Sequence, residues 1–160
     1  MLPNQLRSRL FCSSPPPLTL TSIDHVCLSV TDLPLSINWY RRVLNFKHIH
    51  QDQPHFYPTC TLGSPAFLTS SSINLALLPV SLSSRIPNHN GAHLAFTLPP
   101  SLFTFAKTTL PALLAEHKPA AHHDVSVDFQ DYGIQHSLFF RDPDDNILEL
   151  TCWTNEPSTN

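Results

Sequence analysis

Long apolar runs and clusters of basic residues are both missing from this sequence of 160 residues, and each absence excludes a class of protein. The longest apolar runs, such as Ile73–Val80, are far too short to cross a lipid bilayer, so no membrane partner is expected. The nine lysines and arginines are scattered and the formal net charge is −3. Because no basic stripe is present, no nucleic-acid partner is expected either.

Closely spaced cysteine pairs are also missing. The four cysteines, Cys12, Cys27, Cys60 and Cys152, lie far apart, and none has CxxC spacing. This pattern argues against a zinc ribbon and against a small scaffold held by many disulfides. A reducing compartment, and with it a cytoplasmic location, is therefore the default expectation.

The residues that are present have the composition of one folded domain. Hydrophobic residues make up 41% of the chain and charged residues 13%, which is typical of a globular protein. We expect a flexible N-terminal extension over residues 1–22, a single domain over residues 23–153 and a polar tail over residues 154–160. The extension contains two arginines, a run of three prolines and no acidic residue, so a mitochondrial targeting peptide stays open as an alternative.

Strand-like and helix-like hydrophobic patterns follow one another twice along this domain. Apolar residues alternate over Ile23–Val30 and recur at helical spacing over Leu35–Leu44. Three short strands are expected next, over Phe46–His50, Phe56–Leu62 and Ile73–Leu78. The second series comprises a strand, a helix that Pro111 should kink or interrupt, and three strands, over Ala92–Leu98, Leu102–His117, Val125–Phe129, Gln135–Arg141 and Ile147–Trp153. The sequence therefore predicts an α+β protein built from two βαβββ modules.

Three of the expected strands carry a side chain with metal-ligand chemistry on the face opposite their aliphatic residues. These side chains are His25, His93 and Glu149. If the helices cover the aliphatic faces, the opposite faces line a shared concavity and bring the three residues together. Two imidazoles and one carboxylate suit a divalent metal (Mn, Fe, Zn, Co or Ni), with positions left for water and a small-molecule substrate. Each could instead be an ordinary residue of a half-exposed strand, although a carboxylate among aliphatic neighbours needs a partner or a cation.

Four sequence segments resemble motifs of a known superfamily. They are IDHV at Ile23–Val26, NWYRRVLNF at Asn38–Phe46, GAHLAF at Gly91–Phe96 and FFRDPDDNILEL at Phe139–Leu150. Together they are similar to the vicinal-oxygen-chelate superfamily, which includes glyoxalase I, bleomycin-resistance proteins, fosfomycin-modifying transferases and extradiol dioxygenases. The resemblance implies a glyoxalase-like fold, in which two βαβββ modules form an eight-stranded cup-like mixed sheet. It also implies His25, His93 and Glu149 as metal ligands. A homodimer is implied as well, since many members are dimers, sometimes with halves exchanged between chains.

Two positions depart from particular members of that superfamily. Glyoxalase I has a fourth ligand, a glutamate on its fourth strand, but residues 70–80 contain no carboxylate or histidine, and Asn74 is the polar substitute that remains. Fosfomycin transferases and extradiol dioxygenases often have a tyrosine ten positions before the ligand glutamate, where this chain has Phe139. A phenylalanine cannot donate a proton, which weakens both assignments.

Strand alternation places the substrate-binding candidates on the same faces as the three ligands. These candidates are Cys27, Asn74, Thr97, Gln135, Ser137 and Phe139. Arg141 could meet an anionic substrate, or pair with Asp142 or Asp144 in the adjacent turn.

Two classes of function remain open from the sequence, beside a third in which the metal stabilises a scaffold without turnover. The first is an enzyme whose metal acts as a Lewis acid on neighbouring substrate oxygens in a lyase or isomerase reaction, with Glu149 or a metal-bound hydroxide as the catalytic base. Within this class an extradiol-type Fe(II) dioxygenase is the alternative, because an open facial site also suits O₂. The second class is a non-catalytic protein that sequesters a small molecule in the cup, a role that does not require the three metal ligands.

Overall fold

The predicted order of secondary structure is confirmed by the computed structural model, which describes residues 18–60, 63–81, 91–119 and 125–154. The first module contains β1 (Val26–Val30), α1 (Leu33–Leu44), β2 (Lys47–Ile49), β3 (Ala66–Ser70) and β4 (Ile73–Pro79). The second contains β5 (Leu94–Thr97), α2 (Pro100–Glu116), β6 (Asp128–Asp131), β7 (Gln135–Arg141) and β8 (Ile147–Trp153). The chain is thus an α+β protein of two βαβββ modules.

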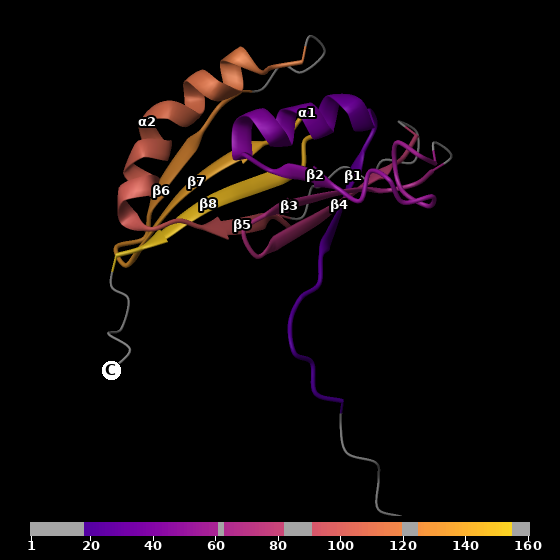
Figure 1. Cartoon of the computed structure of the whole chain (residues 1–160). Coiled ribbons are helices and arrows are strands. Elements are labelled where there is room, and N and C mark those ends of the chain that lie inside the picture. The colour runs from indigo at the N-terminus through magenta and orange to yellow at the C-terminus, as the bar shows by residue number, and fades with distance from the viewer. Residues whose placement is uncertain (1–17, 61–62, 82–90, 120–124, 155–160) are drawn as a thin grey trace, which may run out of the picture.

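Each module forms its own four-stranded mixed sheet with the same topology. The strand orders are β1-β4-β3-β2 and β5-β8-β7-β6. The first and last strands of each module pair in parallel, and the other neighbours are antiparallel. Both helices lie on the same side of the two sheets (Figure 1), and one hydrophobic core contains buried residues of both modules, such as Leu75 and Leu148. Neither helix, within the described part of the chain, is long and apolar enough to span a membrane.

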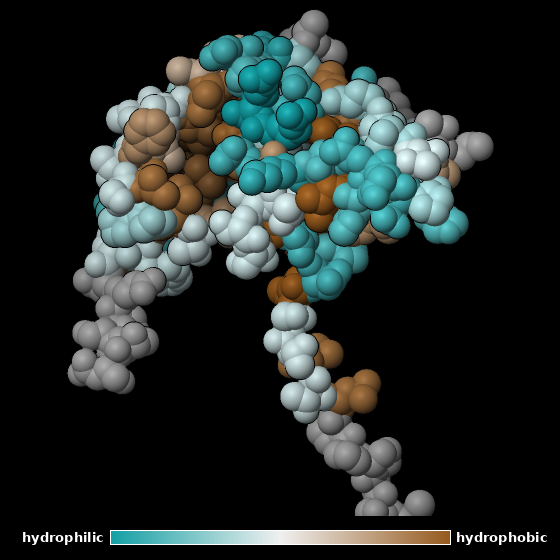
Figure 2. All heavy atoms as spheres, viewed as in Figure 1, coloured by the Kyte–Doolittle hydropathy of each residue, from teal (hydrophilic) through white to brown (hydrophobic). Residues whose placement is uncertain are grey.

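Helix α1 shows how local sequence fixes an element. The Asp32 carboxylate accepts a hydrogen bond from the Leu35 amide at 3.0 Å and caps the N-terminus, while Asn45 ends the helix with a left-handed φ of 56°. Ile37 and Tyr40 are buried, and Arg41 is exposed on the opposite face. Figure 2 accordingly shows hydrophilic side chains over α1, beside apolar side chains on the α2 side of the molecule.

The third strand of the first module lies later in the sequence than predicted. The prediction of a strand over Phe56–Leu62 is wrong for its described residues, which form turns, and β3 starts at Ala66 instead. Two prolines in this region, Pro54 and Pro58, lack the amide donor that a ladder needs. The apolar character of the segment comes from Phe56, whose ring packs against Phe67 of β3 at 4.8 Å.

Pro111 does not interrupt α2. The helix is continuous from Pro100 to Glu116. Pro111 is exposed, and so is Lys107 one turn earlier. The proline therefore lies on the solvent side of the helix, where the loss of one backbone hydrogen bond can be compensated by water.

A buried acidic turn joins the two modules. The turn between β7 and β8 contains Asp142 and Asp144, with exposed fractions of 0% and 3%. Tyr40 of α1 donates its hydroxyl hydrogen bond to Asp142 at 2.7 Å, and Ser36 donates to Asp144 at 2.9 Å. The Thr31 amide and hydroxyl also donate to Asp144, at 2.8 and 2.7 Å. The second module is therefore fixed on the first by neutral donors to buried carboxylates.

Burial sets the ionisation of this turn. Desolvation raises the pKa of Asp142 above its ordinary value, although hydrogen bonds from Asn146 and Tyr40 oppose the shift. Desolvation and the neighbouring Asp142 charge raise the pKa of Tyr40 well above 10.0, so this hydroxyl stays a donor.

Removal of the Tyr40 hydroxyl should lower the free energy of unfolding, because the hydroxyl holds the buried turn. Tyr40→Phe leaves the buried Asp142 carboxylate with one donor fewer, and a hydrogen bond to a charged group contributes about 1.5–3 kcal/mol. We expect a loss of that order in the free energy of unfolding, measured by denaturant titration. Tyr132→Phe, on an exposed residue, is the matched control and should change it by less than about 0.5 kcal/mol. Equal effects of the two substitutions would contradict a stabilising role for the hydrogen bond between Tyr40 and Asp142.

The raised pKa of Asp142 also predicts the sign of a pH dependence. The folded state binds the Asp142 proton more tightly than the unfolded state does. The contribution of Asp142 is therefore greatest below its ordinary pKa of 3.8 and is lost as pH rises through the raised folded value. The stability of wild type relative to Asp142→Asn should fall over that interval, as followed by denaturant titration at several pH values. A relative stability that rises with pH would mean that the folded pKa is lowered.

Candidate metal centre

His93 and Glu149 lie together at the edge of the second sheet. His93 directly precedes β5, and Glu149 is in the middle of β8, paired with Ala95 of β5. The His93 Nε2 atom is 2.9 Å from the Glu149 Oε2 atom. The His93 side chain is 37% exposed and the Glu149 side chain 7%, so the carboxylate is buried and the imidazole is open to solvent.

The His93 ring is oriented by the backbone. Its Nδ1 atom is 2.8 Å from the Gly91 carbonyl oxygen, so Nδ1 carries the hydrogen and donates it. Gly91 has a φ of 69°, the left-handed region that favours glycine, which accounts for glycine in this segment. The ring therefore turns Nε2 toward Glu149, as an N–H donor when the imidazole is protonated and as a lone pair when it is neutral.

The Glu149 carboxylate is held on its other oxygen. Ser137 of β7, which is fully buried, donates its hydroxyl hydrogen bond to Glu149 Oε1 at 2.5 Å. Ser137 thus lies on the face that alternation predicts, beneath Glu149, and its substrate contact stays a prediction.

The donor set between His93 and Glu149 suits a cation. An imidazole nitrogen and a carboxylate oxygen face each other at 2.9 Å, and a proton on Nε2 makes them an ion pair. Without that proton both atoms offer lone pairs, and a metal ion can take its place. At metal–ligand distances of about 2.1 Å this separation fits two adjacent ligands of one divalent ion.

The third predicted ligand, His25, is on the other sheet. It precedes β1, its Nδ1 atom is 2.6 Å from Asp24 Oδ2, and its ring meets Phe67 edge-on. Among the residues that the structure describes, no three His, Cys, Asp or Glu side chains are grouped so that they could hold a metal. One chain thus brings together two of the three predicted ligands and leaves His25 apart.

The strand registers show which residue of the first module is equivalent to Glu149 of the second. In the second module, Glu149 pairs with the residue two positions after His93; in the first, Ala76 pairs with Cys27, two positions after His25. Ala76 therefore occupies the position equivalent to Glu149. Asn74, predicted as the polar substitute for a fourth ligand, lies two residues earlier and donates its side-chain hydrogen bond to the Asp24 carbonyl at 3.1 Å.

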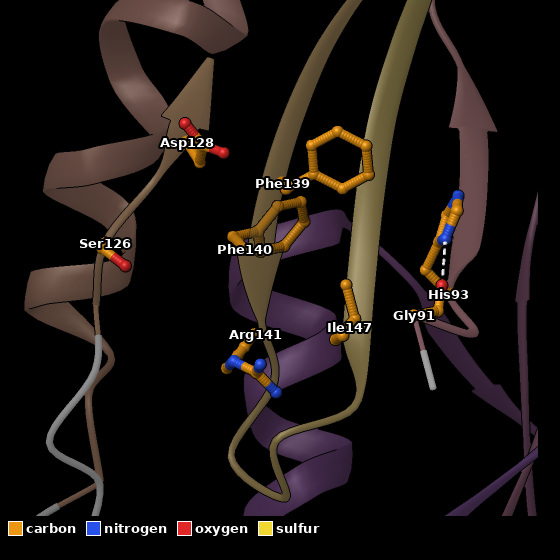
Figure 3. A pocket seen from close by; sticks show the side chains of 8 residues that line it. All are labelled: Gly91, His93, Ser126, Asp128, Phe139, Phe140, Arg141 and Ile147. Carbon is orange, nitrogen blue, oxygen red and sulfur yellow. Dashed lines mark hydrogen bonds between the residues drawn. The ribbon is translucent and has the colours of Figure 1, made fainter. Parts of the chain in front are cut away.

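A cavity of about 440 Å³ opens beside His93. Its walls are formed by Gly91, His93, Ser126, Asp128, Phe139, Phe140, Arg141 and Ile147 (Figure 3). The Phe139 ring meets His93 edge-on, with centroids 5.5 Å apart and an interplanar angle of 81°. Arg141 donates from Nη1 to the Asp145 carbonyl at 2.9 Å. This backbone oxygen belongs to the same turn as Asp142 and Asp144, the alternative partners predicted from the sequence.

Other substrate-binding candidates lie outside the walls of this cavity. Gln135 donates its side-chain hydrogen bond to Thr151 at 2.7 Å, Thr97 is exposed on β5, and Cys27 is exposed on the first sheet. Among the described wall residues that the sequence did not predict, Asp128 is the one with a carboxylate. Its sequence signal was its alternation with Val127 and Phe129; the structure adds that it pairs with Phe139.

Loss of the Ser137 hydroxyl should destabilise the protein. Ser137→Ala leaves a buried oxygen of Glu149 without its donor, which costs about 1–3 kcal/mol. The free energy of unfolding, measured by denaturant titration in the presence of a chelator, tests this without metal. Ser29→Ala, at an exposed serine of β1, is the control and should have little effect. An unaffected Ser137→Ala variant would show that Glu149 is held by other contacts.

One protein family matches a stretch of the chain that includes both modules. A family model described as the Glyoxalase/Bleomycin resistance protein/Dioxygenase superfamily matches residues 22–150. No curated protein is significantly similar to the chain.

Several solved structures share the fold. A glyoxylase/bleomycin resistance protein/dioxygenase domain from Frankia sp. EAN1pec has a TM-score of 0.64 at 21% identity, covering 86% of this chain and 95% of that one. A mutant of the fosfomycin resistance protein FosX from Listeria monocytogenes, complexed with Mn(II) and 1S,2S-dihydroxypropylphosphonic acid, has a TM-score of 0.63 at 17% identity, covering 85% and 95%. FosX from Mesorhizobium loti has a TM-score of 0.59 at 15% identity, covering 88% and 96%. At these identities the likeness establishes the fold alone.

Proposed function

Because the chain belongs to the Glyoxalase/Bleomycin resistance protein/Dioxygenase superfamily, we propose that it is a metal-dependent enzyme acting on a small oxygenated organic molecule. The observation that carries the proposal is the pair of potential ligand atoms, His93 Nε2 and Glu149 Oε2, held 2.9 Å apart with a cavity beside them. A purely structural pair would need only a proton there. The backbone acceptor for Nδ1 and the hydroxyl donor for Glu149 instead orient both groups, as is usual around metal ligands.

His93, Glu149 and His25 are the proposed metal ligands. A divalent metal held by them would supply Lewis-acid polarisation of two neighbouring substrate oxygens, which favours lyase or isomerase chemistry. Mn(II) is the metal of the FosX structure with the same fold, which makes it the first metal to test.

Proton transfer has two candidate carboxylates. Glu149 is the base expected from the sequence, but Ser137 already engages one of its oxygens, and the other faces His93. Asp128 lies on the cavity wall opposite, and accepts a hydrogen bond from Gln130 at 2.8 Å. A ligand carboxylate has little free basicity, so we assign Asp128 as the alternative proton acceptor.

The separate position of His25 leads us to propose a homodimer with shared sites. In each site, His93 and Glu149 of one chain would meet His25 of the partner subunit. The outer face of the first sheet supports this arrangement, because Cys27 is exposed and Leu78 is 39% exposed there. A second copy would cover that apolar surface while it delivered the third ligand.

Mixing two inactive variants tests the ligands and the dimer together. Wild type should hold about one Mn(II) per chain, and His25→Ala and His93→Ala should each lose it, as measured by elemental analysis after gel filtration. A dimer of one His25→Ala chain and one His93→Ala chain has one site with all three ligands. Refolding the two variants together should therefore restore metal to a fraction of the dimers.

The outcomes separate the two parts of the proposal. His55→Ala, at an exposed histidine, is the control and should keep its metal. Metal loss in both variants without restoration on mixing would reject the shared site. A wild type that binds neither Mn, Fe, Zn, Co nor Ni would reject the metal-dependent enzyme, whereas selective retention of Fe would favour dioxygenase chemistry.

A further inference from the structure

We propose that the substrate of this site carries an aromatic ring next to its two metal-binding oxygens; this inference rests on the proposed function. It comes from two partly buried phenylalanines that lie against the predicted histidine ligands. Phe67 and Phe139 both lie on the faces of the sheets that carry the predicted ligands, and neither is fully buried.

The two rings occupy equivalent places in the two modules. Phe67 of β3 pairs with Ala76, and Phe139 of β7 pairs with Glu149, the two positions shown above to be equivalent. Phe67 meets His25 edge-on, with centroids 5.5 Å apart at 78°. Phe139 meets His93 at the same distance and at 81°. Each predicted histidine ligand therefore has a phenyl ring against its side.

A shared site would bring these two rings to one metal. When His25 of the partner subunit joins His93, the ring that lies against each histidine comes with it. Phe67 is itself backed by Phe56, at 4.8 Å and 60°, and by His50 at 6.1 Å, so its wall is aromatic and stiff. An aryl group between two such walls gains edge-to-face and offset contacts that an alkyl group does not.

The charges around the cavity do not favour a doubly charged ligand. Among the described wall residues, Arg141 is the one cation and Asp128 the one carboxylate apart from the metal ligands, so their charges offset each other. Arg141 also donates to the Asp145 carbonyl. Ile147 and Phe139 supply apolar surface. A neutral or singly charged aryl compound fits this wall better than a phosphonate, which needs several cationic or backbone donors.

The affinities for mandelate and lactate test this inference. Both compounds chelate a metal through a hydroxyl and a carboxylate, and mandelate carries a phenyl group where lactate carries a methyl group. We expect Mn(II)-loaded wild type to bind mandelate at least about 10-fold more tightly than lactate, by isothermal titration calorimetry. Phe67→Ala and Phe139→Ala should each reduce this ratio several-fold. Phe139→Leu, which keeps apolar volume, provides the same test if the alanine variant does not fold.

Phe129→Ala is the matched control, since Phe129 lies on the same sheet but pairs with Leu138 and meets Lys107 on the other side. It should leave the ratio unchanged. Equal affinities for mandelate and lactate, tighter binding of 1S,2S-dihydroxypropylphosphonic acid than of mandelate, or a ratio insensitive to both phenylalanines would overturn the inference. Metal content is measured in every variant: metal retained without aryl preference rejects this inference alone, whereas a wild type without metal rejects the proposed function beneath it.

Discussion

The buried carboxylates of the β7–β8 turn are the constraint on which the rest of this structure depends. Asp142 and Asp144 are almost completely removed from water, and their hydrogen bonds come from uncharged groups. Tyrosine, serine and threonine of the first module donate them, together with the amides of the turn itself. Uncharged donors compensate a buried charge incompletely, which is why the pKa of Asp142 is raised. The donors are also directional, so the turn can dock on α1 in one orientation only.

That orientation determines where the candidate site lies. β7 enters the turn and β8 leaves it, so Phe139, Arg141 and Glu149 are all within a few residues of the docked aspartates. Their position relative to the first module is fixed by the bond between Tyr40 and Asp142, which are 102 residues apart. The neighbouring Trp39 of α1 adds a second contact, because its ring packs on Phe140 of β7 with centroids 6.4 Å apart. The two sequence segments that contain these residues, NWYRRVLNF and FFRDPDDNILEL, are therefore held to each other directly in the fold.

The sequence predicted this architecture well where hydrophobic alternation was strong. The bounds of β7 and β8 agree with those predicted, and both His93 and Glu149 lie on the predicted face. The prediction failed over the described residues 56–60, where Phe56 packs against a strand without belonging to one. It also could not identify Ala76 as the residue equivalent to Glu149, because that position depends on pairing register, which alternation does not specify.

The position of His25 has a different cause. Alternation assigns a side chain to a face, but it says nothing about which sheet, or which copy of a sheet, that face will meet. His93 and Glu149 are brought together by the parallel pairing of β5 with β8, whereas β1 pairs with β4 in the other sheet and is not drawn toward them. If His25 of the partner subunit completes the site, metal binding and dimer formation become linked equilibria, and each strengthens the other by mass action. Such a protein would hold its metal at high concentration and release it on dilution, a dependence on concentration that a site built within one chain would lack.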